Sequence, residues 1–241
     1  MAVFVVAHGA WSSGWAWRKM RGMMRDAGHE VFTPSYTGLG ERQHLASDAV
    51  NLSLHIEDVV NVLEFEDLRD VVLIGHSFGG LVATGVADRA RNRVARIVYV
   101  DAFVPEDGQS LMDLLPPRAR DAMSASSRAG DGWRVPPREM PADTTDDQRA
   151  WAMPRRVPHP IAAFEEPLRL SGMPLPPRAY IYCQRADSID TFAPFAARAR
   201  RDGWPYAEID ASHNPHITAA REFCALLESL VLGKDQVSAP R

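Results

Sequence analysis

Cysteine is scarce in this chain, because the 241 residues include only Cys183 and Cys224. Two thiols do not make a disulfide framework, so we interpret them as free, buried thiols of a cytoplasmic protein. A long apolar segment is also missing near the N-terminus, where the run at residues 2–6 is too short for a signal peptide or a membrane span. We therefore expect a cytoplasmic protein with no membrane partner.

Phosphate-binding signatures and a strong charge of one sign are missing as well. The glycine-rich stretch Tyr36–Arg42 contains neither a G-x-G-x-x-G nor a Walker pattern, which argues against a phosphate cradle. The formal net charge of −4 gives no reason to expect nucleic acid or an anionic membrane as a partner. The sequence shows no internal repeat. It leaves the oligomeric state open, a homodimer included.

The segments that are present predict an α/β fold. Helical patterns lie between short apolar runs, and one of them, with Ile56, Val59 and Leu63 at helical spacing, has Ser53 as its expected N-cap. This alternation indicates a doubly wound, mostly parallel sheet of about six strands with helices on both faces. The predicted strands are residues 3–7, 29–34, 71–75, 95–100, 179–183 and 206–209.

The composition changes between residues 105 and 177. This stretch holds most of the prolines, and a structureless loop of that length would be unusual in a compact domain. We interpret residues 105–177 as an inserted cap with short helices, residues 1–104 and 178–233 as the core of one domain, and residues 234–241 as a polar tail.

The stretch Gly75-His76-Ser77-Phe78-Gly79 has the pattern G-x-S-x-G. It follows an apolar strand and precedes a helix-forming segment at residues 81–89, the context that places a nucleophilic serine at a strained turn. Gly75 and Gly79 must be small, because a Cβ there would collide with the adjoining strand or helix. We predict that Ser77 is a nucleophile, with an ordinary tight turn as the alternative.

A serine hydroxyl is a poor nucleophile at neutral pH and needs a base. His213 is the best candidate, because it lies in the loop between the last predicted strand and the last predicted helix, after the serine in chain order. An ordinary histidine pKa of about 6.5 suits it to take and return a proton. His216 competes for this role, although its position is more typical of a helix face.

The acid that orients the base has two candidate locations. Asp101 ends an apolar strand beside the predicted nucleophile strand, where a carboxylate is expected to be partly buried and therefore paired. Asp187 lies just after the predicted strand 179–183, and Asp190 follows it. Both locations can reach His213 in a doubly wound sheet. We favour Asp101 and keep Asp187 as the alternative acid.

Backbone N–H groups are expected to form the oxyanion hole. One comes from Phe78, directly after the nucleophile, and the other from the loop after the first strand, which nominates the amide of Ala10. The alternative for this loop is a simple turn that ends the strand.

Taken together, these motifs resemble a known family. The stretches at residues 6–11, 27–31 and 75–80 are similar to the α/β-hydrolase superfamily. More narrowly, they resemble its small branch of plant methyl esterases and hydroxynitrile lyases, which has many bacterial esterase-like members. The resemblance spans nearly the whole chain and is weakest across residues 105–177. It implies a Ser-His-Asp triad, an oxyanion hole from the Ala10 and Phe78 amides, and no cofactor; we expect no metal site.

Two positions depart from the hydroxynitrile lyases of this branch. Those enzymes carry a lysine after the catalytic histidine and an acidic residue before the serine, where this chain has Asn214 and His76. These differences argue against cyanohydrin cleavage. Plant members place the triad acid after the later strand, where this chain is shortened at residues 184–187, whereas lactonases similar to zearalenone hydrolase place it where Asp101 stands.

The expected function is that of a serine hydrolase. It would cleave a carboxylic ester, or a related lactone or carbamate, of a small apolar or aromatic substrate through an acyl-enzyme. A non-catalytic small-ligand receptor on the same fold is the alternative, and a hydroxynitrile lyase a weaker one. Apolar residues of the cap either line the substrate pocket or form the core of the cap: Leu111, Met112, Met123, Trp133, Trp151 and Phe164.

Overall fold

The computed structural model describes residues 1–186 and 190–233. Six strands form one sheet in the order β2-β1-β3-β4-β7-β8, and each pairing within it is parallel. The strands are β1 (Val3–Ala7), β2 (Glu30–Phe32), β3 (Val71–His76), β4 (Val94–Val100), β7 (Arg178–Cys183) and β8 (Tyr206–Ile209). The predicted fold class, a mostly parallel sheet of about six strands, is confirmed.

The strands are apolar on both sides because the sheet is covered on both faces. Successive residues of β1 alternate between two separate clusters of buried side chains: Phe4 and Val6 enter one, and Val5 and Ala7 enter the other. In β3 all six residues are buried. A strand of this kind is fixed in register by both layers, so its C-terminal end is a rigid place from which to present a side chain.

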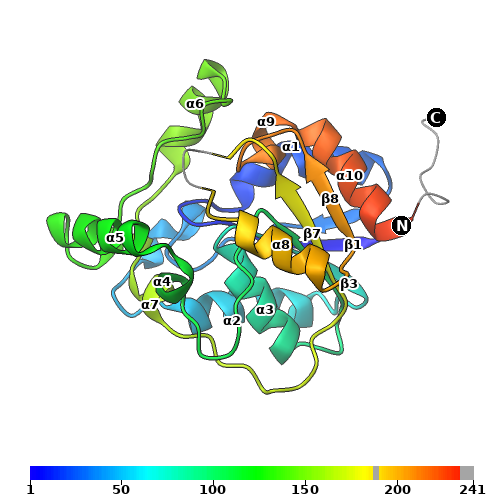
Figure 1. Cartoon of the computed structure of the whole chain (residues 1–241), viewed down its shortest axis with the longest axis horizontal. Coiled ribbons are helices and arrows are strands. Elements are labelled where there is room, and N and C mark those ends of the chain that lie inside the picture. The colour runs from blue at the N-terminus through cyan, green and yellow to red at the C-terminus, as the bar shows by residue number, and fades with distance from the viewer. Residues whose placement is uncertain (187–189, 234–241) are drawn as a thin grey trace.

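Helices pack on the two faces of the sheet in two groups (Figure 1). On one face the buried cluster contains residues of α1 (Arg18–Asp26), α9 (Pro215–Thr218) and α10 (Ala220–Leu232). On the other it contains residues of α2 (Leu52–Phe65), α3 (Gly79–Arg89) and α8 (Ala193–Arg201). Two short 3-10 helices complete this part of the chain: η1 (Gly14–Trp17) lies between β1 and α1, and η2 (Gly40–Leu45) lies between β2 and α2.

Between β4 and β7 the chain forms mostly short elements, with one 13-residue helix, α5 (Pro117–Ala129). Two-residue strands β5 (Arg134–Val135) and β6 (His159–Pro160) pair in antiparallel fashion in a small second sheet. The helices of this stretch, of which α5 and α6 project from the rest of the molecule in Figure 1, are α4 (Leu111–Leu114), α5 (Pro117–Ala129), α6 (Asp146–Ala152), η3 (Met153–Arg155) and α7 (Ala162–Glu165). We call residues 105–177 the cap region below.

Some local expectations were wrong. The N-cap of α2 is Asn51, whose side chain accepts a hydrogen bond from the Leu54 amide at 3.0 Å. Ser53 lies inside the helix, where its hydroxyl and its amide donate to Glu166 of the cap region, each at 2.7 Å. The C-terminal helix is interrupted at Ala219, where φ is −137° and ψ is 43°.

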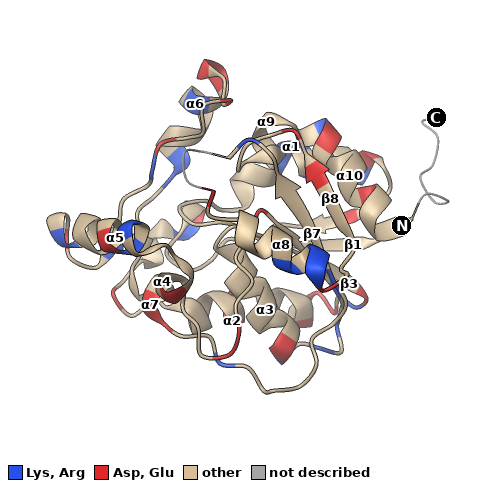
Figure 2. Cartoon of the chain, viewed as in Figure 1, with Lys and Arg blue, Asp and Glu red and all other residues tan. Residues whose placement is uncertain are grey.

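Both signs of charge are distributed over the helices (Figure 2), with acidic and basic residues on α5, α6 and α10. Among the described residues, no helix has both the length and the apolar character needed to cross a membrane.

Candidate active site

The tight connection between β3 and α3 presents Ser77. Its φ is 56°, a left-handed conformation that serine rarely adopts. Backbone hydrogen bonds hold it there: its N–H donates to the Val100 carbonyl at 3.3 Å, and its carbonyl accepts from the Phe103 and Gly80 amides at 3.2 and 3.0 Å. The serine is therefore fixed by the neighbouring strand β4 and by the start of α3.

The two glycines around the serine are required by close approach. A Cβ on Gly79 would lie 2.1 Å from the Ala7 carbonyl oxygen at the end of β1. A Cβ on Gly75 would lie 2.9 Å from the Ala83 Cβ on α3. Both contacts are closer than real Cβ atoms approach, so α3 packs against β1 and β3 at this distance only with glycine at these positions.

Three side chains from distant parts of the sequence form a continuous hydrogen-bonded chain. The Ser77 Oγ lies 2.9 Å from His213 Nε2, and His213 Nδ1 lies 2.7 Å from Asp101 Oδ2. With the imidazole proton on Nδ1, that nitrogen donates to the carboxylate and Nε2 accepts from the serine hydroxyl. This arrangement is that of a serine nucleophile, its base and the acid that orients the base.

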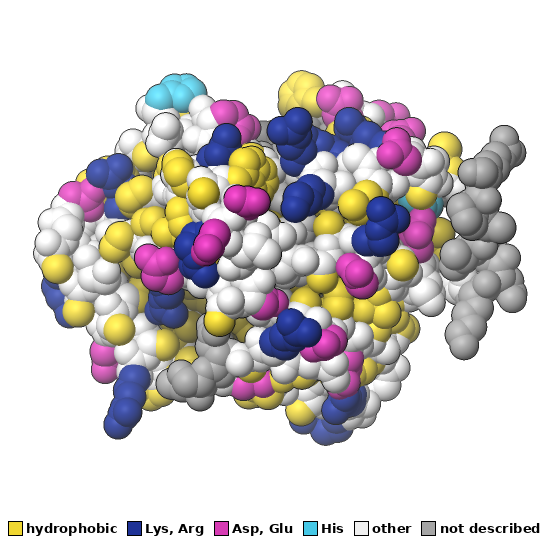
Figure 3. All heavy atoms as spheres, turned by 90° about the horizontal axis from the view of Figure 1, so that it is seen from above, with side chains coloured by type: hydrophobic (Ala, Val, Ile, Leu, Met, Phe, Trp, Pro, Cys, Tyr) yellow, Lys and Arg dark blue, Asp and Glu magenta, His cyan; other side chains and the backbone are white. Residues whose placement is uncertain are grey.

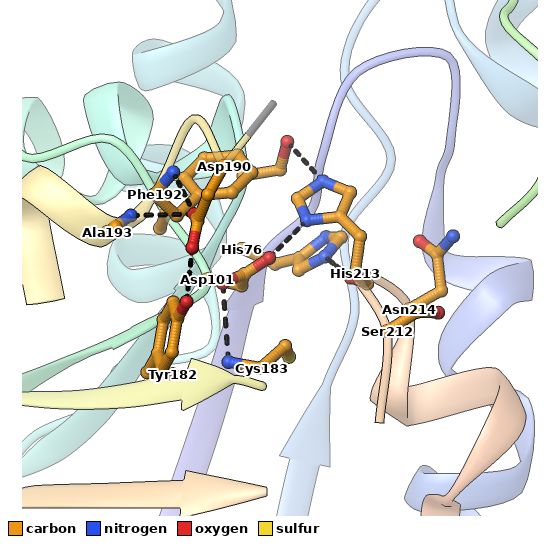
Figure 4. A network of polar contacts seen from close by, with 12 residues as sticks. His76, Asp101, Tyr182, Cys183, Asp190, Phe192, Ala193, Ser212, His213 and Asn214 are labelled. Atoms are coloured by element: carbon orange, nitrogen blue, oxygen red, sulfur yellow. Dashed lines mark hydrogen bonds and ion pairs between the residues drawn. The ribbon is translucent and has the colours of Figure 1, made fainter. Parts of the chain in front are cut away.

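Asp101 follows β4 directly and is almost fully buried, with 4% of its surface exposed. Its φ is 42°, and its amide donates to the Ile181 carbonyl at 2.8 Å. The second carboxylate oxygen accepts from the Cys183 amide at 3.3 Å, so Asp101 lies between β7 and the imidazole (Figure 4). A buried carboxylate needs such partners, and here both oxygens have one.

Asp187, the alternative acid, lies outside the described residues. Asp190 is engaged elsewhere: one oxygen accepts from the Phe192 and Ala193 amides at 3.0 and 2.8 Å at the start of α8, and the other accepts from the Tyr182 hydroxyl (Figure 4). This hydrogen bond is the main reason that the pKa of Tyr182 is raised to about 12.

His213 lies between β8 and α9. Its ring stacks on Phe192, with centroids 4.7 Å apart and planes 9° from parallel. Its carbonyl accepts a 2.7 Å hydrogen bond from Nε2 of His76, the residue before the nucleophile. Burial, together with the nearby His216 and His213, holds the pKa of His76 well below its usual range, so this ring is neutral.

The role of His76 was missed by sequence reasoning, which used it only as an argument against a lyase. Its hydrogen bond joins the nucleophile strand to the loop of the base, two segments that are 137 residues apart in sequence. The competing histidine, His216, is buried and stacks on Trp17, the last residue of η1, at 4.2 Å, so its ring is part of the packing on this face of the sheet.

The loop after β1 is ordered by His8. Burial lowers the pKa of His8 to about 4, so the ring is neutral; its Nδ1–H donates to the Gly9 carbonyl at 2.9 Å and its Nε2 accepts from the Tyr36 amide at 3.3 Å. Ala10 and Phe78 both line the pocket beside Ser77. Within residues 1–186 and 190–233, neither the Ala10 nor the Phe78 amide donates to another protein group. Both amides are thus available to an oxyanion.

A pocket of about 200 Å³ opens above Ser77. Its walls include apolar side chains from the core and the cap region, namely Phe103, Leu111, Leu115, Met123 and Phe192. Of the cap residues singled out from sequence, Leu111 and Met123 line this pocket. Trp151 instead lies edge-on to Trp15 at 5.2 Å, and Phe164 is buried against Phe78 at 5.2 Å.

Arg156 and Arg138 add positive charge to the pocket wall. Burial lowers the pKa of Arg156 to about 10, opposed by the nearby Glu139, so the guanidinium stays charged at neutral pH. In the described part of the chain, no group of three or more His, Cys, Asp and Glu side chains is arranged to hold a metal ion.

This site defines a class of proteins, the serine hydrolases built on an α/β sheet. Its marks are a strained serine between a parallel strand and a helix, and a histidine and an aspartate hydrogen-bonded in line with that serine. Residues 3–226 match the alpha/beta hydrolase family, and the chain belongs to that family. The predicted resemblance is confirmed.

The known relatives include one that matches nearly the whole chain. A carbendazim hydrolyzing esterase from Nocardioides sp. is 39% identical over 95% of this chain and 100% of its own length. Methylesterase 9 from Arabidopsis thaliana is 31% identical over 44% of this chain and 42% of its own length. These relatives confirm the predicted class, a carboxylic ester hydrolase.

One solved structure is similar over nearly the whole fold. It is an extracellular α/β-hydrolase from a Paenibacillus species, described as sharing structural and functional homology with tobacco salicylic acid binding protein 2. It superposes with a TM-score of 0.83 at 25% sequence identity and covers 95% of this chain and 99% of that one.

Proposed function

We propose that Ser77, His213 and Asp101 are the catalytic triad of this esterase and that its substrates are small carboxylic or carbamate esters with a compact alcohol group. The observation that carries the proposal is the unbroken chain of hydrogen bonds, 2.9 Å from Ser77 to His213 and 2.7 Å from His213 to Asp101. This series of hydrogen bonds ends at the carboxylate of Asp101, which is buried and fixed by the Cys183 amide.

The first half of the reaction forms an acyl-enzyme. Ser77 Oγ attacks the ester carbonyl carbon while its proton moves to His213 Nε2. Asp101 holds the ring in the tautomer that can accept this proton and stabilises the imidazolium that results. The C–O bond to the alcohol then breaks, and the leaving oxygen takes the proton from Nε2.

The second half restores the enzyme. A water molecule gives a proton to His213 Nε2 and attacks the acyl carbon, and Ser77 Oγ takes the proton back as it leaves. In both halves the carbonyl oxygen becomes negative, and the amides of Ala10 and Phe78 are the proposed donors to it. One donor of this kind is worth about 100- to 1000-fold in kcat.

The walls of the pocket support an uncharged, aromatic substrate. Apolar side chains form much of the wall, beside charged residues of both signs: Arg138, Arg156 and Arg185 with Glu139 and Asp190. The desolvated guanidinium of Arg156 disfavours a cationic group and favours a substrate with acceptor atoms. The full-length relative acts on carbendazim by its name, and the partial relatives are methylesterases. We therefore propose methyl carbamates and methyl esters of small aromatic groups as the substrate class.

We also propose residues 105–177 as the cap of the pocket and residues 1–104 and 178–233 as the core, since Leu111 and Met123 reach the pocket from the cap region. A cytoplasmic location is supported by two free, buried thiols; burial raises the pKa of Cys224 to about 12. The Paenibacillus relative is extracellular, so cell fractionation is the measurement that decides.

Small molecules are the proposed partners, without nucleic acid or membrane. On the face in Figure 3, hydrophobic side chains are interspersed with both signs of charge, which supports this expectation.

Release of the alcohol group tests the function: methanol from carbendazim and methyl benzoate, p-nitrophenol from p-nitrophenyl acetate, and choline from the choline ester. Wild type, Ser77→Ala and the exposed control Ser47→Ala are incubated with carbendazim, methyl benzoate, p-nitrophenyl acetate and a choline ester. We expect turnover of the uncharged esters by wild type and Ser47→Ala, little turnover of the choline ester, and a loss of about 10⁴-fold or more in Ser77→Ala. Equal rates for wild type and Ser77→Ala would exclude the proposed mechanism.

The same samples separate the alternative functions. A fluorophosphonate probe labels an activated serine but not an inert receptor, and cyanide release from mandelonitrile reports a lyase. Asn214 and His76 stand where the lyases carry a lysine and an acidic residue, so we expect labelling without cyanide release.

A further inference from the structure

The backbone of Trp11 adopts a conformation that a tryptophan rarely takes. Its φ is 58°, in the left-handed region that favours glycine. Trp11 directly follows Ala10, whose amide is a proposed oxyanion donor. A bulky residue stays in such a conformation only where the surrounding contacts hold it. The contacts that hold Trp11 therefore also constrain the loop that carries the Ala10 amide.

Both N–H groups of Trp11 are bound by the small sheet of the cap region. The backbone N–H donates to His159 Nδ1 at 3.3 Å, and the indole Nε1–H donates to the Val135 carbonyl at 2.8 Å. Val135 and His159 face each other across the β5–β6 pair. One pair of opposite residues thus supplies both acceptors, although it is more than 120 residues away from Trp11 in sequence.

His159 also packs on the residue that carries the second proposed oxyanion donor. Its ring lies 5.1 Å from the ring of Phe78, nearly perpendicular to it, and stacks on Phe164 at 4.4 Å. The side chain is completely buried. His159 is therefore in contact with Phe78 on one side of the oxyanion site and, through a hydrogen bond, with the residue next to Ala10 on the other.

The state of the imidazole shows what this residue supplies. Because Nδ1 accepts from Trp11, the ring proton is on Nε2, and burial followed by the nearby His55 holds the pKa of His159 well below its usual range. Nε2 has no hydrogen-bond partner among the described residues. An apolar side chain would fill this space without burying an unpaired N–H. What a histidine adds is the acceptor at Nδ1.

We propose that His159 is a positioning residue for the oxyanion hole, holding the Ala10 amide in place through Trp11 from the cap region. The proposal rests on the proposed function, since the oxyanion hole is a part of the acyl-transfer mechanism proposed above. It makes the cap a contributor to the rate of the chemical step as well as to the choice of substrate.

Three variants test the proposal with p-nitrophenyl acetate. His159→Leu keeps the volume and removes the acceptor. His159→Asn returns an acceptor oxygen near the position of Nδ1. Trp11→Phe removes the indole donor and keeps an aromatic ring at this position. We expect kcat of His159→Leu to fall about 10- to 100-fold with KM within a factor of about 3, because a misplaced donor weakens the transition state more than the ground state.

The rescue separates positioning from packing. His159→Asn should recover most of the lost kcat, although asparagine fills the cavity less well than leucine. The kcat of Trp11→Phe should lie between those of His159→Asn and wild type. A trifluoromethyl ketone inhibitor forms an oxyanion on Ser77, so its affinity for the variants should fall in proportion to their kcat. The midpoint of the pH profile of kcat should be the same in the variants as in wild type. His159→Leu with an unchanged kcat, or His159→Asn no better than His159→Leu, overturns the proposal.

Amide hydrogen exchange gives a readout that does not depend on turnover. The Trp11 N–H should be protected in wild type and in His159→Asn and should exchange about tenfold faster or more in His159→Leu. Equal exchange in wild type and His159→Leu also overturns the proposal. The turnover of Ser77→Ala with p-nitrophenyl acetate keeps the two conclusions apart. If it equals that of wild type, the proposed function fails, whereas the exchange result still decides whether His159 holds Trp11.

Discussion

The two sides of the pocket are built in different ways. The core side consists of strands with both faces buried, and Ser77 and Asp101 come directly after β3 and β4. The cap side consists of a pair of two-residue strands and of helices that are short apart from the 13-residue α5. It is attached to the core by buried apolar side chains, such as Phe164 and Leu168, and by polar contacts such as Ser53 with Glu166 and Ser212 with Asp143.

This difference separates two requirements of an esterase. Positions that must be accurate to a fraction of an ångström are fixed by two packed layers, whereas the wall that selects a substrate can vary without disturbing the sheet. The division is not complete, because cap residues contact the loop after β1 and the loop of His213: His159 accepts from the amide of Trp11, and Asp143 accepts from the amide of Ser212.

The strongest test of the core side is Asp101→Asn. An amide cannot hold His213 in the accepting tautomer, so we expect kcat to fall by about 10³- to 10⁴-fold while the fold is kept. Asp190→Asn and Asp187→Asn are the matched controls, and each should stay within about tenfold of wild type. Steady-state kinetics on one ester settle the comparison. A larger loss of kcat in Asp187→Asn than in Asp101→Asn would assign the role of the triad acid to Asp187.

Gly79→Ala tests how tightly the core is packed. Its new Cβ would lie 2.1 Å from the Ala7 carbonyl and 2.6 Å from that of His8, so α3 or β1 must shift. We expect a loss of about 3 kcal/mol or more in the free energy of unfolding, measured by urea titration. Gly22→Ala, in α1 with nothing within 4 Å of the new Cβ, should gain roughly 0.5–1 kcal/mol. Similar effects at the two positions would contradict this account of the packing.

On the cap side, Leu115→Ala enlarges the pocket that its side chain lines. We expect kcat/KM for aromatic esters to fall about 10-fold, in line with 1–3 kcal/mol for a lost apolar contact, and the rate with an acetyl ester to change much less. The neighbouring Leu114→Ala, which does not line the pocket, is the control. Equal losses for both acyl groups would assign Leu115 a structural role.

The last prediction concerns pH and the buried histidines of the core. Burial lowers the pKa of His216 from its ordinary 6.5 to about 3. In the unfolded chain this histidine is therefore protonated below pH 6.5, whereas in the folded chain it is protonated only below about pH 3. The stability that this group contributes is complete above pH 6.5 and is lost as the pH falls through that window.

His216→Phe removes this linkage. Between pH 6 and 4 the stability of the variant should fall less steeply than that of wild type, by about 1.4 kcal/mol per pH unit. Urea titrations at several pH values measure the slopes, and identical slopes would show that His216 is not neutral and buried in solution.

The sequence predicts the core side better than the cap side for a physical reason. A parallel sheet repeats one rule: an apolar strand is followed by a loop at the same edge, so Ser77, Asp101 and His213 could be expected to meet there. Their positions follow from strand ends, and the structure brings them within hydrogen-bonding distance, while their catalytic roles stay a proposal. In the cap region no such rule applies, and Trp151 and Phe164 pack away from the pocket.

The parts that could not be predicted are contacts between side chains and distant backbone. His76 donates to a carbonyl 137 residues away, and His159 accepts from an amide 148 residues away. Neither has a local sequence signal. Even a local prediction failed where two polar residues competed, since Asn51 rather than Ser53 caps α2.

The left-handed residues bear on engineering. Among the described residues, five other than glycine have a positive φ: Trp11, Asp67, Asp70, Ser77 and Asp101. Three of them carry or adjoin the proposed machinery, and the other two lie in the turn between α2 and β3. For a thermostable version of this esterase, glycine at Asp70 would relieve backbone strain without touching the proposed machinery. The same substitution at Trp11, Ser77 or Asp101 would relieve strain at the cost of activity.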